Sequence, residues 1–339
     1  MTHSVSVPGR VNLIGEHIDY LGFPVLPMAL TRRIRLDFTP RCDRRIRVSG
    51  PDYGEREFEW TPDLPPYAQG DFGNYLKAAA QAVSIRWGIS NGFDGTLTST
   101  LPPAAGLSSS SALVIAVTLA LLRIRDIRPE FEPLMEVLPE GEQYVGTRGG
   151  GMDHAVCLAG RARCAIRIDF NPARVHAESI PPAWDFFVAH SLQRAEKSGA
   201  AREAYNRRRA LSRQGDPTAL RHANSERERV ENAIQAMRAG DLSRFGALLN
   251  ESHNSLRDNL QVSCDCADHL VEACRRAGAS GARIMGAGFG GYVVGLCERR
   301  DTNELLARLD RDHFSHLPKR SGFPDYLMQV EAGDGALFL

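Results

Sequence analysis

Ionisable side chains gather close to the N-terminus of this sequence. Glu16, His17 and Asp19 fall within four residues, and Arg10 precedes them in the stretch Gly9–Tyr20. An ionised carboxylate accepts two hydrogen bonds in a fixed geometry, so Asp and Glu are natural partners for sugar hydroxyls. The stretch therefore predicts a motif that binds a polyol, and residue types alone leave an ordinary polar turn beside a strand as the alternative.

A glycine turn followed by four consecutive serines forms the second motif. Its residues are Gly106, Leu107, Ser108, Ser109, Ser110, Ser111 and Ala112. Free N–H groups and the positive end of the helix dipole bind anions at a helix N-terminus, and serine hydroxyls bind phosphate oxygens or Mg²⁺. A helix cap needs only one serine, so the run favours a phosphate-binding loop over a plain cap. It is not a Walker motif, because no Gly-Lys-Ser/Thr follows.

Glycines recur near the C-terminus, at Gly286, Gly288 and Gly291. This spacing fits the dinucleotide fingerprint G-x-G-x-x-G, but that fingerprint requires a helix after the glycines. An apolar, strand-like segment at 292–296 follows instead. The glycines therefore favour a loop whose backbone approaches a phosphate or lines an active site.

A fourth segment combines glycines with acidic residues. Glu142 lies eleven positions before Asp153, and Asp153 closely follows the run Gly149-Gly150-Gly151. A kinase needs groups that bind phosphate, ligands for Mg²⁺ and an Asp near the acceptor hydroxyl. We expect Asp153 to lie in an exposed loop as that Asp and Glu142 to bind the metal, with a surface helix position as the alternative for Glu142.

Predicted strands and helices surround these motifs in both halves of the chain. Residue types and apolar alternation predict strands at 34–38, 45–48, 163–169, 185–189 and 292–296. Apolar periodicity predicts helices at 72–87, 108–124 and 268–277, and the charged segment 196–236 is also helix-forming. The expected fold is α/β or α+β, with domains at 1–185 and 186–339.

Composition excludes several classes of protein. The 339 residues contain 41 Lys and Arg and 41 Asp and Glu, whereas a dedicated nucleic-acid binder shows a basic excess. The most apolar run, 112–122, is about half the length that spans a bilayer. Seven cysteines without a C-x-x-C pair favour reduced thiols. The N-terminus lacks the pattern of a signal peptide, so we expect a cytoplasmic monomer that binds neither nucleic acid nor membranes.

Taken in order, the four motifs resemble the GHMP kinase superfamily, and within it the galactokinase and N-acetylgalactosamine kinase branch. The resemblance extends from Pro8 to about Val294, and the segments 203–208 and 261–264 are also similar to galactokinases. It implies an N-terminal domain like ribosomal protein S5 domain 2 and a ferredoxin-like C-terminal domain. The active site would lie between them and use ATP and Mg²⁺.

The resemblance also implies roles for single residues. Asp153 would take or orient the proton of the C1 hydroxyl of a sugar, and Arg10 would lower the pKa of Asp153 and stabilise the transferring phosphoryl group. The other implied roles are sugar binding for Glu16, His17, Asp19 and Tyr205, Mg²⁺ binding for Ser110 and Glu142, and nucleotide binding for Gly106 to Ala112 with Gly286 and Gly288.

The implied reaction is the ATP-dependent phosphorylation of galactose to galactose 1-phosphate. Ile18 stands where most galactokinases have Thr, and the segments 19–24 and 146–153 are nearer the N-acetylgalactosamine kinases, whereas Tyr205 is galactokinase-like. N-acetylgalactosamine or another pyranose is therefore the alternative substrate. An alternative from another class is a sensor that binds galactose and ATP without catalysis, although such relatives tend to lose residues from the serine run. A non-sugar alcohol such as mevalonate is disfavoured, because its carboxylate would need cations at the acidic motif.

Overall fold

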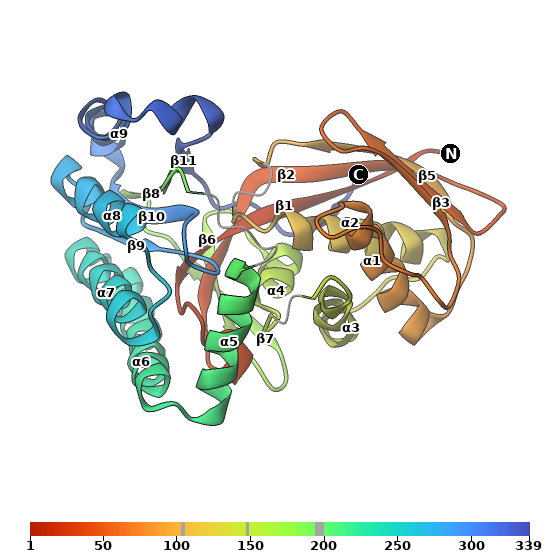
Figure 1. The fold of residues 1–339 in the computed structure, drawn as a ribbon, viewed down its shortest axis with the longest axis horizontal. Helices are drawn as coiled ribbons and strands as arrows, with labels where there is room; N and C mark the ends of the chain where they lie inside the picture. The colour runs from red at the N-terminus through yellow and green to blue at the C-terminus, as the bar shows by residue number, and fades with distance from the viewer. Residues whose placement is uncertain (103–105, 147–148, 194–199) are drawn as a thin grey trace.

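A computed structural model gives the structure of residues 1–102, 106–146, 149–193 and 200–339 (Figure 1). A six-stranded sheet of order β12-β1-β2-β5-β3-β4 dominates the first half. Its strands are β1 (His3–Ile14), β2 (Leu26–Pro40), β3 (Arg45–Gly50), β4 (Gly54–Glu59), β5 (Phe93–Ser99) and β12 (Leu337–Phe338). The predicted strands at 34–38 and 45–48 are confirmed within β2 and β3.

Helices of the first half pack beside this sheet (Figure 1). They are α1 (Gly73–Trp87), α2 (Ser109–Ile124), α3 (Phe131–Tyr144) and α4 (Met152–Ala159). The predicted helices at 72–87 and 108–124 are confirmed as α1 and α2, each starting one residue later. Residues 111–122 of α2 are all buried, because this helix contacts β1, β2 and three other helices. An all-round apolar helix is stable only in such a position.

The second half contains a four-stranded sheet of order β11-β8-β10-β9. Its strands are β8 (Trp184–His190), β9 (Gly281–Ile284), β10 (Tyr292–Glu298) and β11 (Leu327–Val330). Alternate residues of β8 enter different cores, since Phe186 and Val188 join the core of the first half and Phe187 and Ala189 join a second core with α8 and α9. Both faces are covered, which explains why β8 is buried along its whole length and β10 is buried up to Cys297, and why most of their residues are apolar.

The described residues of this half form the α-helices α5 (Ala200–Gln214), α6 (Pro217–Ala239), α7 (Leu242–Ser255), α8 (Asp265–Ala277) and α9 (Thr302–Asp312). Residues 196–199 of the charged segment predicted to be helical lie outside the described residues. The rest of that segment, 200–236, contributes two of these helices, because Gly215 adopts a positive φ of 85° and Asp216 caps α6 through the N–H groups of Thr218 and Ala219. A π-helical turn, Leu256–Leu260, follows α7. The predicted helix at 268–277 is confirmed within α8.

The predicted strand at 163–169 is confirmed as β6 (Cys164–Asp169), which pairs with β7 (Arg174–Ser179) in a separate two-stranded sheet. The second sheet starts at Trp184, near the predicted boundary at 185, but the C-terminal tail returns to the first sheet. There Phe338 pairs with Val5, and Ala332 forms a bridge to Leu30. The domain boundary at 185 thus stays a prediction, and the C-terminal tail packs on the side of that boundary to which it does not belong in sequence. In the part of the chain that the structure describes, no helix has the length and apolarity to cross a membrane.

Candidate active site

Arg10 and Asp153 form a bidentate ion pair between β1 and α4. Arg10 Nε donates to Asp153 Oδ1 at 2.7 Å and Arg10 Nη2 donates to Oδ2 at 2.8 Å. Burial alone would lower the pKa of Arg10, but the adjacent Asp153 carboxylate outweighs burial and the net pKa is raised. The guanidinium therefore stays charged, while the Asp153 side chain keeps 20% of its surface exposed. A fixed cation beside an accessible carboxylate suits the transfer of a negatively charged group.

The expected loop position of Asp153 is wrong, because Asp153 lies in the first turn of α4. Gly151 adopts a positive φ of 101° directly before this helix and allows the chain to enter it. The positive end of the helix dipole favours a carboxylate in the first turn. Gly151 thus sets where the helix begins, and the dipole favours the ionised form of the Asp153 carboxylate.

The serine run lies against this ion pair. Arg10 Nη1 donates to the carbonyl oxygen of Gly106 at 2.7 Å, and Ser108 Oγ donates to Asp153 Oδ2. Ser108 has a left-handed φ of 59°, and its side chain does not cap α2. The plain-cap alternative is therefore wrong for Ser108, the residue at the cap position. Ser109 and Ser110 follow in the first turn and are partly exposed, whereas Ser111 is fully buried.

The turn after β1 carries the sugar-binding residues predicted from the sequence. His17 has a φ of 59°, and its Nε2 lies 3.3 Å from the carbonyl oxygen of Ala287, while Nδ1 lies 3.3 Å from the hydroxyl of Tyr20. Because a carbonyl oxygen only accepts, Nε2 carries the proton and Nδ1 accepts from Tyr20. Burial and the nearby His222 lower the pKa of His17 to about 3, so this ring is neutral at physiological pH.

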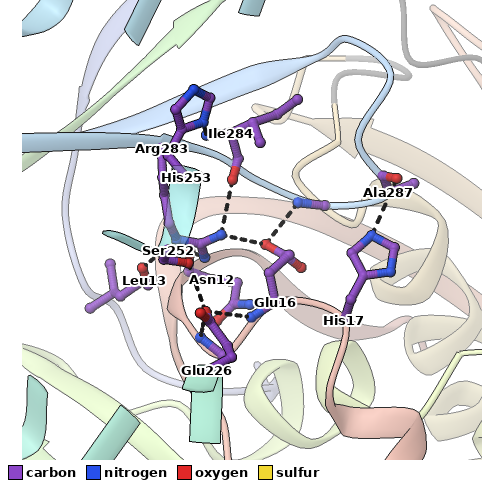
Figure 2. Close-up of polar contacts among 12 residues, drawn as sticks. Asn12, Leu13, Glu16, His17, Glu226, Ser252, His253, Arg283, Ile284 and Ala287 are labelled. Atoms are coloured by element: carbon purple, nitrogen blue, oxygen red, sulfur yellow. Dashed lines mark hydrogen bonds and ion pairs between the residues drawn. The ribbon is translucent and has the colours of Figure 1, made fainter. Parts of the chain in front are cut away.

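Glu16 connects this turn to the glycine-rich loop (residues 286–291), as Figure 2 shows. Its Oε2 atom accepts from Arg283 Nη1 at 3.0 Å and from the backbone N–H of Gly286 at 2.9 Å. Arg283 is fully buried and also donates to the carbonyl oxygens of Leu13 and Asn12, at 2.8 and 2.6 Å. Glu16, a residue that the sequence resemblance assigns to sugar binding, thus holds the loop in place through its Oε2 atom.

Asp19 lies close to the glycines that precede α4. The backbone N–H of Gly150 donates to Asp19 Oδ2 at 3.0 Å, and a Cβ at position 150 would lie 2.4 Å from backbone atoms of Asp19 and Tyr20. Only glycine fits there. Burial raises the pKa of Asp19 to about 6, and the charge of Asp153 adds to the effect. The carboxyls of Asp19 and Asp153 are therefore close enough for the charge of one to raise the pKa of the other.

Tyr205, on α5, completes an aromatic wall beside this turn. Its ring centre lies 5.3 Å from that of His17 and 6.4 Å from that of Tyr20. The four residues predicted to bind the sugar therefore lie in or beside this turn, namely Glu16, His17, Asp19 and Tyr205. Of the predicted metal residues, Ser110 is described at the start of α2, but Glu142 is placed only by its backbone in α3, and its side chain lies outside the described residues.

The glycine-rich loop faces the serine run. A Cβ at Gly286 would lie 4.0 Å from the carbonyl oxygen of Gly106, and both Gly286 and Gly288 have positive φ angles. The strand β10 follows the loop, as the sequence predicts, so the Rossmann arrangement is absent from this described segment. The two loops therefore line the same site as the Arg10 and Asp153 pair.

Sequence reasoning missed Glu226, a fully buried carboxylate on α6. It accepts from the N–H groups of Gly15 and Glu16 at 2.9 and 3.2 Å, from Ser252 Oγ at 2.7 Å and from Arg229 Nε at 2.7 Å. Burial by itself would raise the pKa of Glu226, but nearby cationic groups lower it to about 2. Glu226 is therefore an ionised anchor for the backbone of the sugar turn (Figure 2).

His222, one helical turn before Glu226, fixes the same backbone. Its Nε2 donates to the carbonyl oxygen of Glu16 at 2.9 Å, and its Nδ1 lies 2.9 Å from Ser255 Oγ. The spacing of His222 and Glu226, four residues apart on one face of a helix, was the available signal. This spacing does not stand out in the sequence, because both residues lie in a segment with many other charged side chains.

Comparisons with known proteins match segments in both halves of the chain. The model of the GHMP kinases N terminal domain matches residues 74–161, that of the GHMP kinases C terminal matches 233–316, and the galactokinase galactose-binding signature matches 2–39. A galactokinase of Roseiflexus sp. (strain RS-1) is 35% identical over 327 residues, which cover 87% of this chain and 83% of that protein.

Solved structures are similar along the whole chain. Lactococcus lactis galactokinase complexed with galactose has a TM-score of 0.90 at 26% identity, and the match covers 100% of this chain and 95% of that one. Methanococcus jannaschii mevalonate kinase shares the fold, with a TM-score of 0.73 at 18% identity over 98% of both chains.

Proposed function

Because this chain belongs to the galactokinase family, it is a sugar kinase with the two-domain GHMP kinase fold, and we propose that it transfers the γ-phosphoryl group of ATP to the C1 hydroxyl of galactose. One observation carries the proposal. The Asp153 carboxylate is held by Arg10 and Ser108 at the point where the galactose-binding signature meets the serine run.

In this reaction Asp153 orients the C1 hydroxyl and takes its proton. Phosphoryl transfer depends mainly on positioning and on stabilising negative charge, so a pre-aligned carboxylate and a permanently charged guanidinium match its needs. Arg10 engages both oxygens of Asp153 and so fixes the direction in which the carboxylate accepts. The same guanidinium stabilises the charge that develops on the transferring group.

Sugar binding is assigned to the turn after β1 and to Tyr205. Asp19 offers a carboxylate that interacts electrostatically with Asp153, and neutral His17 is oriented by Ala287 and Tyr20. Tyr205 stands against the His17 ring and closes one side of this space. We place the Tyr205 ring beside C2 of the sugar, where it excludes an acetamido group, and therefore favour galactose over N-acetylgalactosamine.

The serine run fits ATP and Mg²⁺. Ser109 and Ser110 are partly exposed in the first turn of α2, where backbone N–H groups have no helical partners and attract phosphate. Ser110 is the proposed Mg²⁺ ligand from this turn, because a hydroxyl oxygen suits this ion, and Glu142 is the proposed second ligand. When bound, the metal neutralises charge on the phosphates.

An ADP-release assay on a panel of sugars tests the proposal. We expect turnover with galactose at least about a hundredfold better than with glucose by kcat/KM, since a mismatched epimer leaves a buried carboxylate unpaired. Phosphorus NMR of the product should show an anomeric phosphate. Faster turnover of N-acetylgalactosamine would correct the substrate, and sugar binding without any ADP release would identify a sensor instead. We also propose a cytoplasmic monomer, in keeping with seven free cysteines, and size-exclusion chromatography tests the oligomeric state.

A further inference from the structure

Two cysteines outside the catalytic machinery are in contact at the start of α8. Cys264 precedes the helix in an extended conformation, Cys266 is its second residue, and their Sγ atoms lie 3.1 Å apart. Both are free thiols with partly exposed side chains. Of the other five cysteines, four are buried and Cys42 is exposed far from this pair in the sequence. The chain thus holds one adjacent, accessible dithiol.

Cys266 is connected to the glycine-rich loop through Gln193. The Cys266 thiol donates to Gln193 Oε1 at 3.2 Å, and Gln193 Nε2 donates to the carbonyl oxygen of Phe289 at 2.9 Å. The carbonyl oxygen of Gln193 accepts from the N–H of Gly291 at 2.9 Å. Gln193 therefore holds the loop at two points and contacts the dithiol at a third.

Cys264 reaches the same loop by way of Val262. The carbonyl oxygen of Val262 accepts from the N–H of Phe289 at 2.7 Å, and a Cβ at Gly288 would lie 2.2 Å from that oxygen. Cys264 and Phe289 also pack against one small apolar cluster. The loop thus rests directly on the segment that leads into Cys264, with no space to absorb a shift.

We propose that a hydroperoxide oxidises Cys264 and Cys266 to an intrachain disulfide, and that this disulfide lowers the sugar kinase activity by disturbing the glycine-rich loop. The site lies outside the proposed catalytic residues, and only the activity part of this proposal depends on the proposed function.

The chemistry balances with one equivalent of hydrogen peroxide. The sulfur of Cys266 attacks one peroxide oxygen, the O–O bond breaks, and water leaves after taking up the thiol proton, so Cys266 becomes a sulfenic acid. The sulfur of Cys264 then attacks Cys266, the S–O bond breaks, and a second water leaves with the Cys264 proton. Burial and the Cys266 thiol raise the pKa of Cys264 to about 12, which makes Cys264 the second thiol to react.

Disulfide formation draws the two residues together. The sulfur atoms have to approach by about 1 Å, from 3.1 Å to the length of a disulfide bond. The carbonyl oxygen of Cys264 accepts from the N–H groups of Ala267 and Asp268, both at 2.9 Å, so the start of α8 resists a shift and the segment on the Val262 side of Cys264 is left to adjust. The disulfide also removes the thiol hydrogen that Cys266 donates to Gln193. Both links to the loop therefore change together.

The test treats the reduced full chain with hydrogen peroxide, alkylates the remaining thiols and locates the oxidised residues by mass spectrometry. We expect Cys264 and Cys266 to lose one hydrogen each and to escape alkylation. We also expect kcat/KM with galactose and ATP to fall about three- to thirtyfold, the range of such indirect coupling, and to recover with dithiothreitol. Cys266→Ser should keep the basal activity, since a hydroxyl still donates to Gln193, and should abolish the response.

Cys42→Ser is the matched control, because it removes the exposed cysteine outside the pair and should leave the response intact. A sulfinic acid at Cys266 beside an alkylated Cys264 would overturn the proposal. So would an unchanged kcat/KM in protein whose disulfide is complete, or inhibition that persists in Cys266→Ser. A chain that forms the disulfide but turns over no sugar would support the dithiol and refute the proposed function, so the two failures are distinguishable.

Discussion

Replacing Glu226 by Gln tests whether a buried carboxylate holds the sugar turn in place. The fall in the pKa of Glu226 from its ordinary value of 4.5 to about 2 corresponds to about 3 kcal/mol of stability at neutral pH. The carboxylate of Glu226 accepts from four donors, whereas a Gln side chain has only one acceptor oxygen. The NH₂ group of Gln would replace the other oxygen and place its own hydrogens against the remaining donors. We therefore expect Glu226→Gln to lower the free energy of unfolding by about 3 kcal/mol.

The sign of the pH dependence follows from the direction of this shift. A lowered pKa in the folded state gives stability above the ordinary pKa, and that stability is lost as the pH falls through the folded value. The difference between wild type and Glu226→Gln should thus be constant near neutrality, begin to shrink below about pH 5 and fall to about half near pH 3. Urea denaturation at several pH values measures it.

A purely structural role would change stability alone, so the assay also includes kinetics. Glu226 binds the N–H groups of Gly15 and Glu16, and a displaced turn should lower kcat/KM for galactose about ten- to hundredfold at a temperature where the variant is folded. Glu228→Gln is the matched control, since Glu228 is exposed on the same helix. If Glu226→Gln stays within about 0.5 kcal/mol of this control, the anchoring argument is refuted.

Three further predictions concern the site itself. Asp153→Asn should keep the circular dichroism spectrum and reduce kcat at least about a hundredfold, and turnover within about tenfold of wild type would reject the base role. Ser110→Ala should raise the Mg²⁺ concentration for half-maximal rate more than Ser111→Ala does, because Ser111 is buried; the reverse order would shift the assignment by one residue. Since burial raises the pKa of Asp19 to about 6, kcat/KM for galactose should rise with pH through about 6, and Asp19→Asn should remove this step; an unchanged profile in the variant would assign it to another group.

Elements with a long, uniform apolar pattern could be predicted from the sequence. Helix α2 begins within one residue of its predicted start, because its apolar run allows only a buried position. The short helix at Asp153 could not be predicted. Helix α4 has eight residues, too few to show a period, and it begins where the positive φ of Gly151 permits, which a sequence does not reveal. The loop assignment of Asp153 failed for that reason.

The site shows a second limit of sequence reasoning. The motif types predicted which loops meet, because phosphate and sugar chemistry restrict the side chains that serve them. They did not predict what holds those loops, since Arg283 and Glu226 are distant from the turn in sequence and neither type is characteristic of an anchor. A buried charge is costly unless it is fully paired, and only the folded structure shows such pairing.

Glu16 illustrates how the two kinds of role combine. Its carboxylate belongs to the galactose-binding signature, yet its Oε2 atom binds both Arg283 and the N–H of Gly286. His17 in the same turn lies within hydrogen-bonding distance of Ala287 in the same loop. The turn to which we assign sugar binding therefore also fixes the loop opposite the serine run. Since each side is positioned by the other, the proposed sugar and phosphate subsites form one unit, and the buried anchors on α6 and β9 hold that unit between the two halves of the chain.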